Sequence, residues 1–226
     1  MSMKLERLYL QTELRALGEE DEEDEEDEFA IEGYAATFDG EADLGDFRER
    51  CNPRCFTRAL QEGQEVRCLR NHDPNFVLGR TKNRTLQLMA DNRGLRFRCQ
   101  LDRSNPEHRA THSMIRRGDL DGCSFAFLPN RNGGDTWSQV RGADGNLYAL
   151  RELLDVDLQD VSVCTYPAYN STSVQARSAL FFPDGQSAEM RSAIEQHRSN
   201  NSLRTDSPDA PSQEELERQL RAIRLW

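Results

Sequence analysis

Residues 95–101 alternate strictly between apolar and polar side chains, and this pattern limits the fold more than any other feature of the 226-residue chain. The run reads Leu95-Arg96-Phe97-Arg98-Cys99-Gln100-Leu101. A period of two is typical of a β-strand with one buried face. A second β-prone run at 85–88 precedes it, and the Asp-Asn-Arg-Gly segment at 91–94 suits a hairpin turn. We therefore expect an antiparallel hairpin within a larger sheet.

Two further segments predict strands. Residues 29–38 form a β-prone run that is followed by an Asp-Gly pair. Residues 156–163 alternate again, and one face of that run carries Val156, Leu158, Asp160 and Ser162. Several strands spread over the middle of the chain indicate a substantial sheet or barrel.

Two helices are marked by their end signals. Asn52 is placed to cap one helix, which Gly63 ends. Ser104 and Glu107 form the capping-box pattern of a second helix, which ends at Gly118. Strands interrupted by two helices predict an α+β fold.

A run of ten consecutive carboxylates, residues 19–28, separates the N-terminus from this patterned region. The chain has 40 acidic and 29 basic residues, so 30 acidic residues remain when the ten are set aside. The acidity is therefore local, and a like-charge run of this kind is expected to form a solvated, disordered loop. We expect an N-terminal arm over 1–28 that ends in this run.

The C-terminal part is poor in large apolar residues. Residues 170–212 are rich in Ser, Asn, Asp and Pro and are predicted to be mostly flexible. A capping box at Ser212 and Glu215 then begins an amphipathic helix over 213–226. The apolar face of that helix needs a partner.

Several functional classes are disfavoured by composition. No apolar stretch approaches the roughly 18 residues of a membrane helix, and the N-terminus lacks the apolar core and cleavage site of an export signal. The six cysteines have no zinc-like spacing and are expected to be free core thiols. Because the chain is net acidic, we expect no direct nucleic-acid binding. The chain is expected to be soluble and intracellular, and no cofactor is indicated.

Ser124 is a candidate nucleophile, because Gly122 allows a sharp turn just before a strand-like apolar run. A small hydroxyl at such a point can face a cleft, with backbone N–H groups nearby for an oxyanion. A strand serine bonded to backbone fits the same pattern. Cys123 is a minor alternative nucleophile, although its side chain is expected on the opposite face of the strand.

His72 stands where a strand-like run breaks into a turn, and histidine is the natural general base near neutral pH. A turn histidine that bonds its neighbours is the competing interpretation. His108 and His112 are spaced like metal ligands, but no third ligand is obvious, so we expect a solvated helix face without a metal.

Asp160 is the candidate third member, since a carboxylate on a buried strand face needs a partner such as a histidine N–H. Asp157, on the opposite face, is the fallback. A solvated acid at a strand end is the remaining alternative.

The ordered set of these segments resembles the prohead (capsid maturation) serine proteases of tailed bacteriophages, which are related in fold to herpesvirus assemblins. The resemblance covers about residues 29–177. The segments that carry it are Glu32–Phe38, Asn71–Pro74, Val77–Thr81, Asp91–Leu95, Ile115–Asp119, Gly122–Phe127 and Asp160–Tyr169.

This resemblance implies a Ser/His/acid triad on Ser124, His72 and Asp160, where members of the family more often carry Glu in place of Asp160. It leaves the choice between Asp160 and Asp157 open, and it allows an arginine such as Arg80 to assist at the oxyanion. It also implies a β-barrel-like core flanked by helices, with the protease domain at 29–177 and a flexible tail at 178–226.

The role implied by the resemblance is cleavage of scaffold and capsid-protein extensions inside the immature capsid, in the host cytoplasm. The major capsid protein and the scaffold are then substrates, and the assemblins imply a homodimer. Self-cleavage is also implied. We expect it in the tail from Asn170 onward, with the 213–226 helix as a docking element.

Two non-enzymatic functions fit part of the sequence. A scaffold or assembly chaperone would bind basic capsid surfaces through the acidic run and the terminal helix. An acidic decoy would mimic DNA through residues 19–28.

Overall fold

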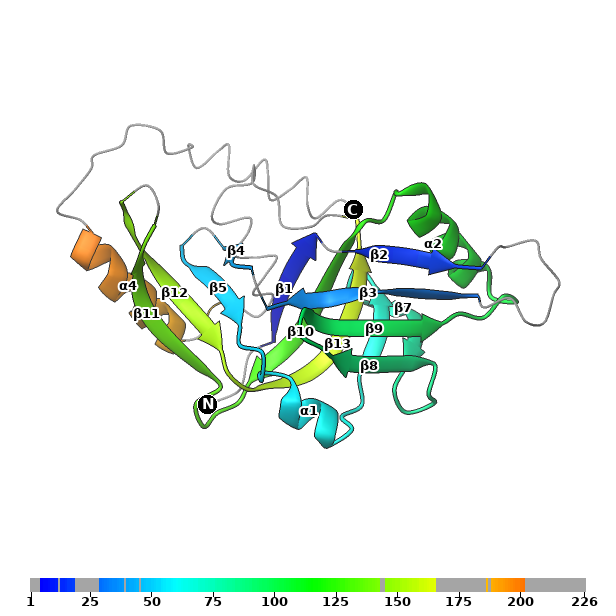
Figure 1. Ribbon diagram of the computed structural model, residues 1–226, viewed down its shortest axis with the longest axis horizontal. Coiled ribbons are helices and arrows are strands. Elements are labelled where there is room, and N and C mark those ends of the chain that lie inside the picture. The colour runs from blue at the N-terminus through cyan, green and yellow to red at the C-terminus, as the bar shows by residue number, and fades with distance from the viewer. Residues whose placement is uncertain are drawn as a thin grey trace.

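The computed structural model consists mainly of β-sheet with a few helices (Figure 1). It describes residues 5–11, 13–18, 29–38, 40–44, 46–142, 145–165, 186 and 188–201. The strands in these residues form one five-stranded sheet and two four-stranded sheets. Both the α+β class and the predominance of strands agree with the sequence patterns.

The five-stranded sheet lies at the centre of the molecule. Its strands, in spatial order, are β1 (Glu6–Gln11), β10 (Gly122–Pro129), β13 (Val156–Cys164), β6 (Arg67–Arg70) and β7 (Asp73–Arg80). The β13–β6 pair is parallel, whereas the other pairs are antiparallel. Strand β13 therefore has a partner on each side.

The second sheet contains the predicted hairpin. Its strands, in order, are β2 (Leu14–Leu17), β3 (Ala30–Thr37), β9 (Gly94–Gln100) and β8 (Leu86–Ala90). Leu95, Phe97 and Cys99 are buried, as the alternation predicted. The Asp91 carboxylate accepts the backbone N–H groups of Arg93 and Gly94, which fixes the turn between β8 and β9.

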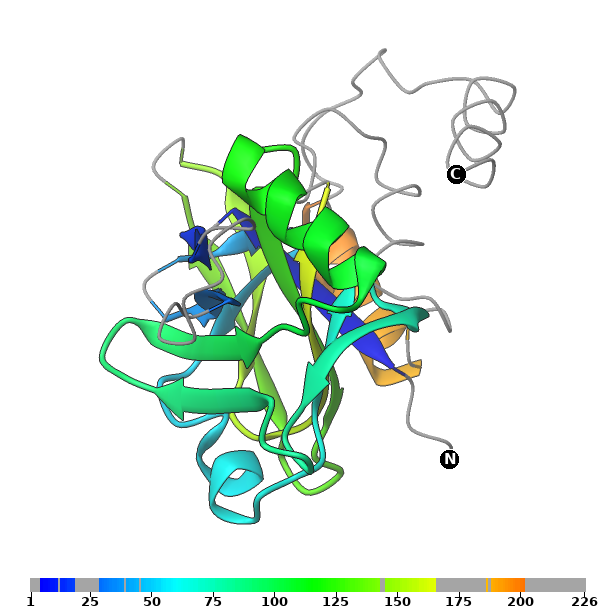
Figure 2. The same cartoon turned by 90° about the vertical axis from the view of Figure 1, so that its right-hand side faces the viewer.

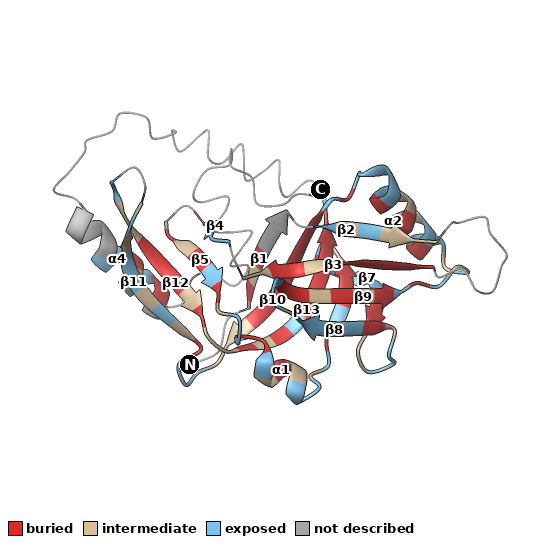
Figure 3. Cartoon of the chain, viewed as in Figure 1, coloured by how far each residue is buried: buried red, intermediate tan, exposed pale blue. Residues whose placement is uncertain are grey.

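The third sheet lies on the other side of the central one (Figure 1). Its strands, in order, are β11 (Asp135–Arg141), β12 (Leu147–Leu153), β5 (Arg48–Cys51) and β4 (Ala42–Asp43). One hydrophobic core joins the three sheets and contains Phe125 from β10, Phe97 from β9 and Leu153 from β12. Figure 3 shows the buried residues concentrated where β3, β9, β10 and β13 meet.

The expected barrel-like core is present only as open sheets. None of the three sheets formed by the described strands closes on itself. Strands β1 and β2 belong to segment 1–28, which the sequence suggested was an arm, and both are paired within sheets. The acidic run 19–28 lies outside the described residues.

Helix α1 (Thr57–Gln61) is shorter than predicted. The Asn52 side chain does cap a turn by accepting the N–H of Arg54, at 3.0 Å. However, the backbone oxygen of Cys55 accepts the N–H of Val156 at the start of β13, so it is not used for a helical bond. The chain enters the core at this turn before the helix begins at Thr57.

Helix α2 (Pro106–Arg117) ends at Gly118, which has a φ of +79°, as predicted. The N-cap differs from the prediction, because the side chain of Asn105, rather than that of Ser104, accepts the N–H of Glu107. Ser104 instead donates to Asp102. Figure 2 shows α2 on the outside of the sheets, near β7.

Helix α4 (Ala188–Asn201) contradicts the prediction of a flexible tail over 178–226 for this part of the chain. Met190 and Ile194, one helical turn apart, are buried, and the helix packs beside β12 (Figure 1). The helix predicted over 213–226 lies outside the described residues.

A β-bulge in β13 corrects the predicted alternation of that strand. Ala126 of β10 faces Asp160, but the next residue, Phe127, faces Leu158, so Gln159 is the extra residue. Leu158 therefore joins the hydrophobic core with Phe127, and it does not share a face with Asp160 as predicted.

The six cysteines are all buried and free, as expected. None of the described helices combines the length and the apolar character that crossing a membrane requires.

A buried arginine connects the central sheet to the third sheet. Arg151 on β12 is 2% exposed and contacts the carboxyl groups of Glu6 on β1, Glu49 on β5 and Asp135 on β11. One positive charge faces three carboxyl groups in a place shielded from water. Burial raises the pKa of Glu49 to about 8, so at neutral pH this carboxyl is largely protonated.

We predict that Glu49 makes stability depend on pH. Its pKa rises from 4.5 to about 8 on folding, so the stabilisation is full below pH 4.5 and is lost as the pH rises through 8. Between pH 6 and 8, the unfolding temperature should fall by roughly 5 °C more in the wild-type chain than in Glu49→Gln. Thermal unfolding followed by circular dichroism at pH 6, 7 and 8 measures this difference. Parallel curves for the two chains would contradict the prediction.

Candidate functional site

Three neighbouring strands of the central sheet bring the predicted site residues together. Ser124 on β10 lies directly opposite Ser162 on β13, which in turn lies beside Leu69 on β6. Asp160 precedes Ser162 by two residues on the same strand, and His72 follows the end of β6. The sheet register therefore sets which side chains meet.

A tight turn places His72 beside Ser124, Asp160 and Ser162. Arg70 and Asp73 are paired across β6 and β7, which leaves a two-residue loop of Asn71 and His72. Both loop residues have positive φ, +55° and +56°, as a type I′ hairpin requires. The Asn71 side chain accepts bonds from the backbone N–H and the hydroxyl of Thr165, at 3.0 Å each. A non-glycine residue with this backbone is costly, and such strain is concentrated at functional sites.

The imidazole of His72 connects Ser124 to Asp160. Its Nε2 lies 2.7 Å from Ser124 Oγ, and its Nδ1 lies 2.6 Å from Asp160 Oδ1. The side chains of Ser124 and His72 are buried.

Ser162 is a member of the site that sequence reasoning did not assign. Its Oγ accepts the backbone N–H of His72 at 3.1 Å and donates to Asp160 at 2.9 Å. Because a carboxylate can only accept hydrogen bonds, the proton between His72 and Asp160 is assigned to Nδ1. Nε2 is then free of a proton and can accept the Ser124 hydroxyl. The only sequence signal for Ser162 was its place two residues after Asp160 on one strand.

This arrangement can generate a serine nucleophile. A neutral imidazole at 2.7 Å can take the hydroxyl proton as Oγ attacks a carbonyl carbon. The carboxylate on the other ring nitrogen holds the required tautomer and stabilises the imidazolium that forms. No metal is needed for these steps. Among the described residues, no three His, Cys, Asp or Glu side chains are grouped as a metal site.

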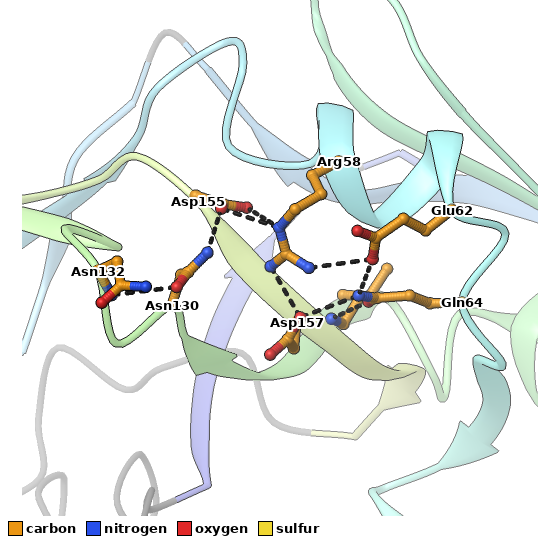
Figure 4. A network of polar contacts seen from close by, with 8 residues as sticks. Arg58, Glu62, Gln64, Asn130, Asn132, Asp155 and Asp157 are labelled. Atoms are coloured by element: carbon orange, nitrogen blue, oxygen red, sulfur yellow. Dashed lines mark hydrogen bonds and ion pairs between the residues drawn. The ribbon is translucent and has the colours of Figure 1, made fainter.

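Asp157, the alternative acid, has other partners. Its carboxylate lies 2.7 Å from Nη2 of Arg58 and accepts a bond from Gln64 at 2.9 Å. Figure 4 shows Arg58 also held by Asp155, so the network ties helix α1 to the start of β13. Burial acts to raise the pKa of Asp157, but Arg58 and Gln64 lower it overall. The structure brings Asp160, and not Asp157, to His72.

The remaining candidates lie apart from the site. Cys123 belongs to the hydrophobic core and pairs with Val163, on the face of β10 opposite Ser124. Arg80 forms an ion pair with Glu65 at the end of β7 remote from His72.

The solvated histidine face predicted for α2 is wrong. His112 is completely buried and its Nε2 lies 3.0 Å from the backbone oxygen of Leu17. His108 accepts the N–H of Asp102 at Nδ1 and bonds the backbone oxygen of Val77 at 3.0 Å. Both histidines face backbone groups of neighbouring strands, because their helix face packs inward.

A serine hydroxyl, an imidazole and a carboxylate joined in this order are the chemical groups of a serine hydrolase. Comparison with known families gives the class more narrowly. Residues 17–181 match the caudovirus prohead serine proteases, and the chain belongs to that family. The chain is therefore a serine peptidase. This assignment takes the place of the scaffold and DNA-mimic functions considered above. No curated protein and no solved structure matches the chain.

We predict that an Asp→Asn substitution lowers activity strongly at Asp160 and only slightly at Asp157. Asp160→Asn should lower activity on the order of 10⁴-fold, because an amide favours the wrong tautomer of His72. Asp157→Asn should keep activity within a few fold and only weaken the contact with Arg58. The measurement is the rate at which a fluorophosphonate, which modifies active serines, labels each full-length chain. If Asp157→Asn caused the larger loss, Asp160 would not be the acid.

We also predict that Ser162→Ala lowers the labelling rate of Ser124 about tenfold. The substitution leaves the His72 N–H without its acceptor and removes one bond to Asp160. An unpaired buried polar group should also reduce the free energy of unfolding by about 1–3 kcal/mol. Ser138→Ala, at an exposed serine of β11, is the matched control and should change neither quantity. If Ser124 is labelled in the Ser162→Ala chain at the wild-type rate, Ser162 has only a structural role.

Proposed function

We propose that this chain is a capsid maturation endopeptidase in which Ser124 is the nucleophile, His72 the general base and Asp160 the acid. The observation that supports it best is the continuous chain of contacts from Ser124 Oγ through the His72 ring to Asp160, at 2.7 and 2.6 Å. Membership in the prohead protease family supports the substrate class.

The proposed reaction has two halves. His72 Nε2 takes the proton of Ser124 as Oγ bonds to the carbonyl carbon of the scissile peptide. The tetrahedral intermediate collapses, the C–N bond breaks, and His72 gives its proton to the leaving amine. Water, deprotonated by His72, then attacks the acyl-enzyme, and Ser124 recovers its proton as the new carboxylate leaves. Asp160 remains ionised throughout and orients the imidazole.

The proposed substrates are extensions of the scaffold and the major capsid protein. The reaction would take place inside the immature capsid, in the host cytoplasm. We place the protease domain at 29–177, with β1 and β2 added to its sheets by the preceding segment. A fold relationship to the assemblins, and the homodimer they imply, rest on the sequence resemblance alone.

Self-cleavage is part of the same proposal. Its expected location is the tail from Asn170 onward, and the segment 213–226 is the proposed docking element. Deletion of 213–226 with unchanged incorporation into immature capsids would refute the docking role.

The proposal predicts that the purified wild-type chain shortens with time and that Ser124→Ala does not. Intact-mass spectrometry over several hours, in parallel for both chains, measures the change and locates the cleavage sites. Removal of the nucleophile should slow the reaction by a factor on the order of 10⁶.

Two other outcomes are informative. Equal shortening of both chains would assign the cleavage to a contaminating protease. If neither chain shortens, the wild-type chain is co-expressed with the capsid protein. A capsid protein that stays uncleaved in this experiment would contradict the proposed function.

A further inference from the structure

Strand β1 lies beside the proposed nucleophile, although it falls outside the residues that match the family. Tyr9 is paired with Ser124, and Arg7 is paired with Ala126. Leu8, between them, is buried in the core on the opposite face. The first strand of the chain therefore forms one border of the site.

Arg7 projects from the face of the sheet that carries Ser124. Opposite residues of an antiparallel pair share a face, and residues two apart on a strand do so as well. Arg7, Ala126 and Asp160 thus form one row across β1, β10 and β13. Ser124 has His72 on its β13 side and Arg7 on its β1 side. The small side chain of Ala126 leaves room for a guanidinium to extend along β10.

The guanidinium has unused hydrogen-bonding capacity. Its Nε is buried and has no hydrogen-bond partner among the described residues. Burial raises the pKa of Cys164, and the positive charge of Arg7 acts in the opposite direction. Cys164 lies opposite Gly122, which precedes Ser124 by two residues. The charge of Arg7 therefore acts on a residue of β13 that lies two positions beyond Ser162, the partner of Ser124.

The backbone around Ser124 offers no competing donor. From Gly122 to Ala126, β10 is paired with β1 on one side and with β13 on the other. In such a strand the N–H groups point alternately to the two neighbours and are used by the ladders. The backbone oxyanion site that the sequence led us to expect is not available on this stretch. A negative charge beside Ser124 needs a side-chain donor.

We propose that Arg7 is a catalytic residue that binds the oxyanion formed when Ser124 attacks the substrate carbonyl. This inference rests on the proposed function of Ser124. It replaces Arg80, which is paired with Glu65 and lies on β7, three strands away from β10, whereas β1 is adjacent to β10. The carbonyl oxygen acquires a full negative charge as its π electrons move onto it, and the Nε–H of Arg7 donates to that oxygen.

The neighbouring residue fixes β1 in place. Glu6 points to the opposite face, where it pairs with the buried Arg151. Adjacent residues of one strand thus have separate tasks: Glu6 anchors the strand, and Arg7 serves the site. A short strand held by a buried ion pair keeps the backbone of Arg7 in a fixed position beside the site.

The test compares Arg7→Gln and Arg7→Lys with wild type in the full-length chain. The rate of fluorophosphonate labelling of Ser124 is measured from pH 5.5 to 9, because the phosphonyl oxygen occupies the place of the oxyanion. Arg7→Gln should lower the plateau rate 10²–10³-fold without moving the pH midpoint, and Arg7→Lys should lose less. Arg15→Gln, at an exposed arginine paired with Glu32 on β3, is the matched control and should label like wild type.

Three results would overturn the inference. Labelling of Arg7→Gln within threefold of wild type would show that the oxyanion does not use this side chain. A shifted pH midpoint with an unchanged plateau would assign Arg7 a purely electrostatic effect on His72. Equal losses in both variants, together with a lower unfolding temperature, would assign it a structural role. If Ser124 of the wild-type chain is not labelled and a co-expressed capsid protein stays unprocessed, the proposed function is overturned instead, and this inference with it.

Discussion

The pairing of β13 with strands on both sides is the constraint on which the site depends. Its antiparallel partner β10 carries Ser124, and its parallel partner β6 leads directly to His72. A slip of one residue would turn Asp160 and Ser162 into the core and bring valines to the site. Two features hold the register: the bulge at Gln159, and the Arg58 network that fixes the first residues of β13.

Much of this arrangement could be predicted from the sequence. The alternation at residues 95–101 identified β9 because one face of that strand meets the core and the other does not. Ser124, His72 and Asp160, which the structure brings into contact, were proposed as site residues by joining local signals with the family resemblance. The spacing of residues along β13 selected Asp160, the carboxylate that contacts His72, for an incomplete reason, since it assumed an unbroken alternation that Gln159 interrupts.

Other features depend on contacts between distant segments, which a linear pattern does not contain. His108 and His112 looked solvated because imidazole is polar, but their ring nitrogens find backbone oxygens on neighbouring segments. Helix α1 starts late because a β13 residue takes the Cys55 oxygen. Ser162 gave only a weak signal, its place two residues after Asp160, since its role comes from the backbone N–H of His72, 90 residues away.

The site draws on nearly the whole described chain, from β1 to the end of β13. The imidazole meets Ser124 across 52 residues of sequence and Asp160 across 88. Ribosomes add about 5–20 residues per second, so the β10 serine emerges seconds before the strand that completes its surroundings. A growing chain therefore cannot bring Ser124, His72 and Asp160 together until β13 has been synthesised. The order of synthesis delays the formation of the site by the time needed to add the residues between β10 and β13.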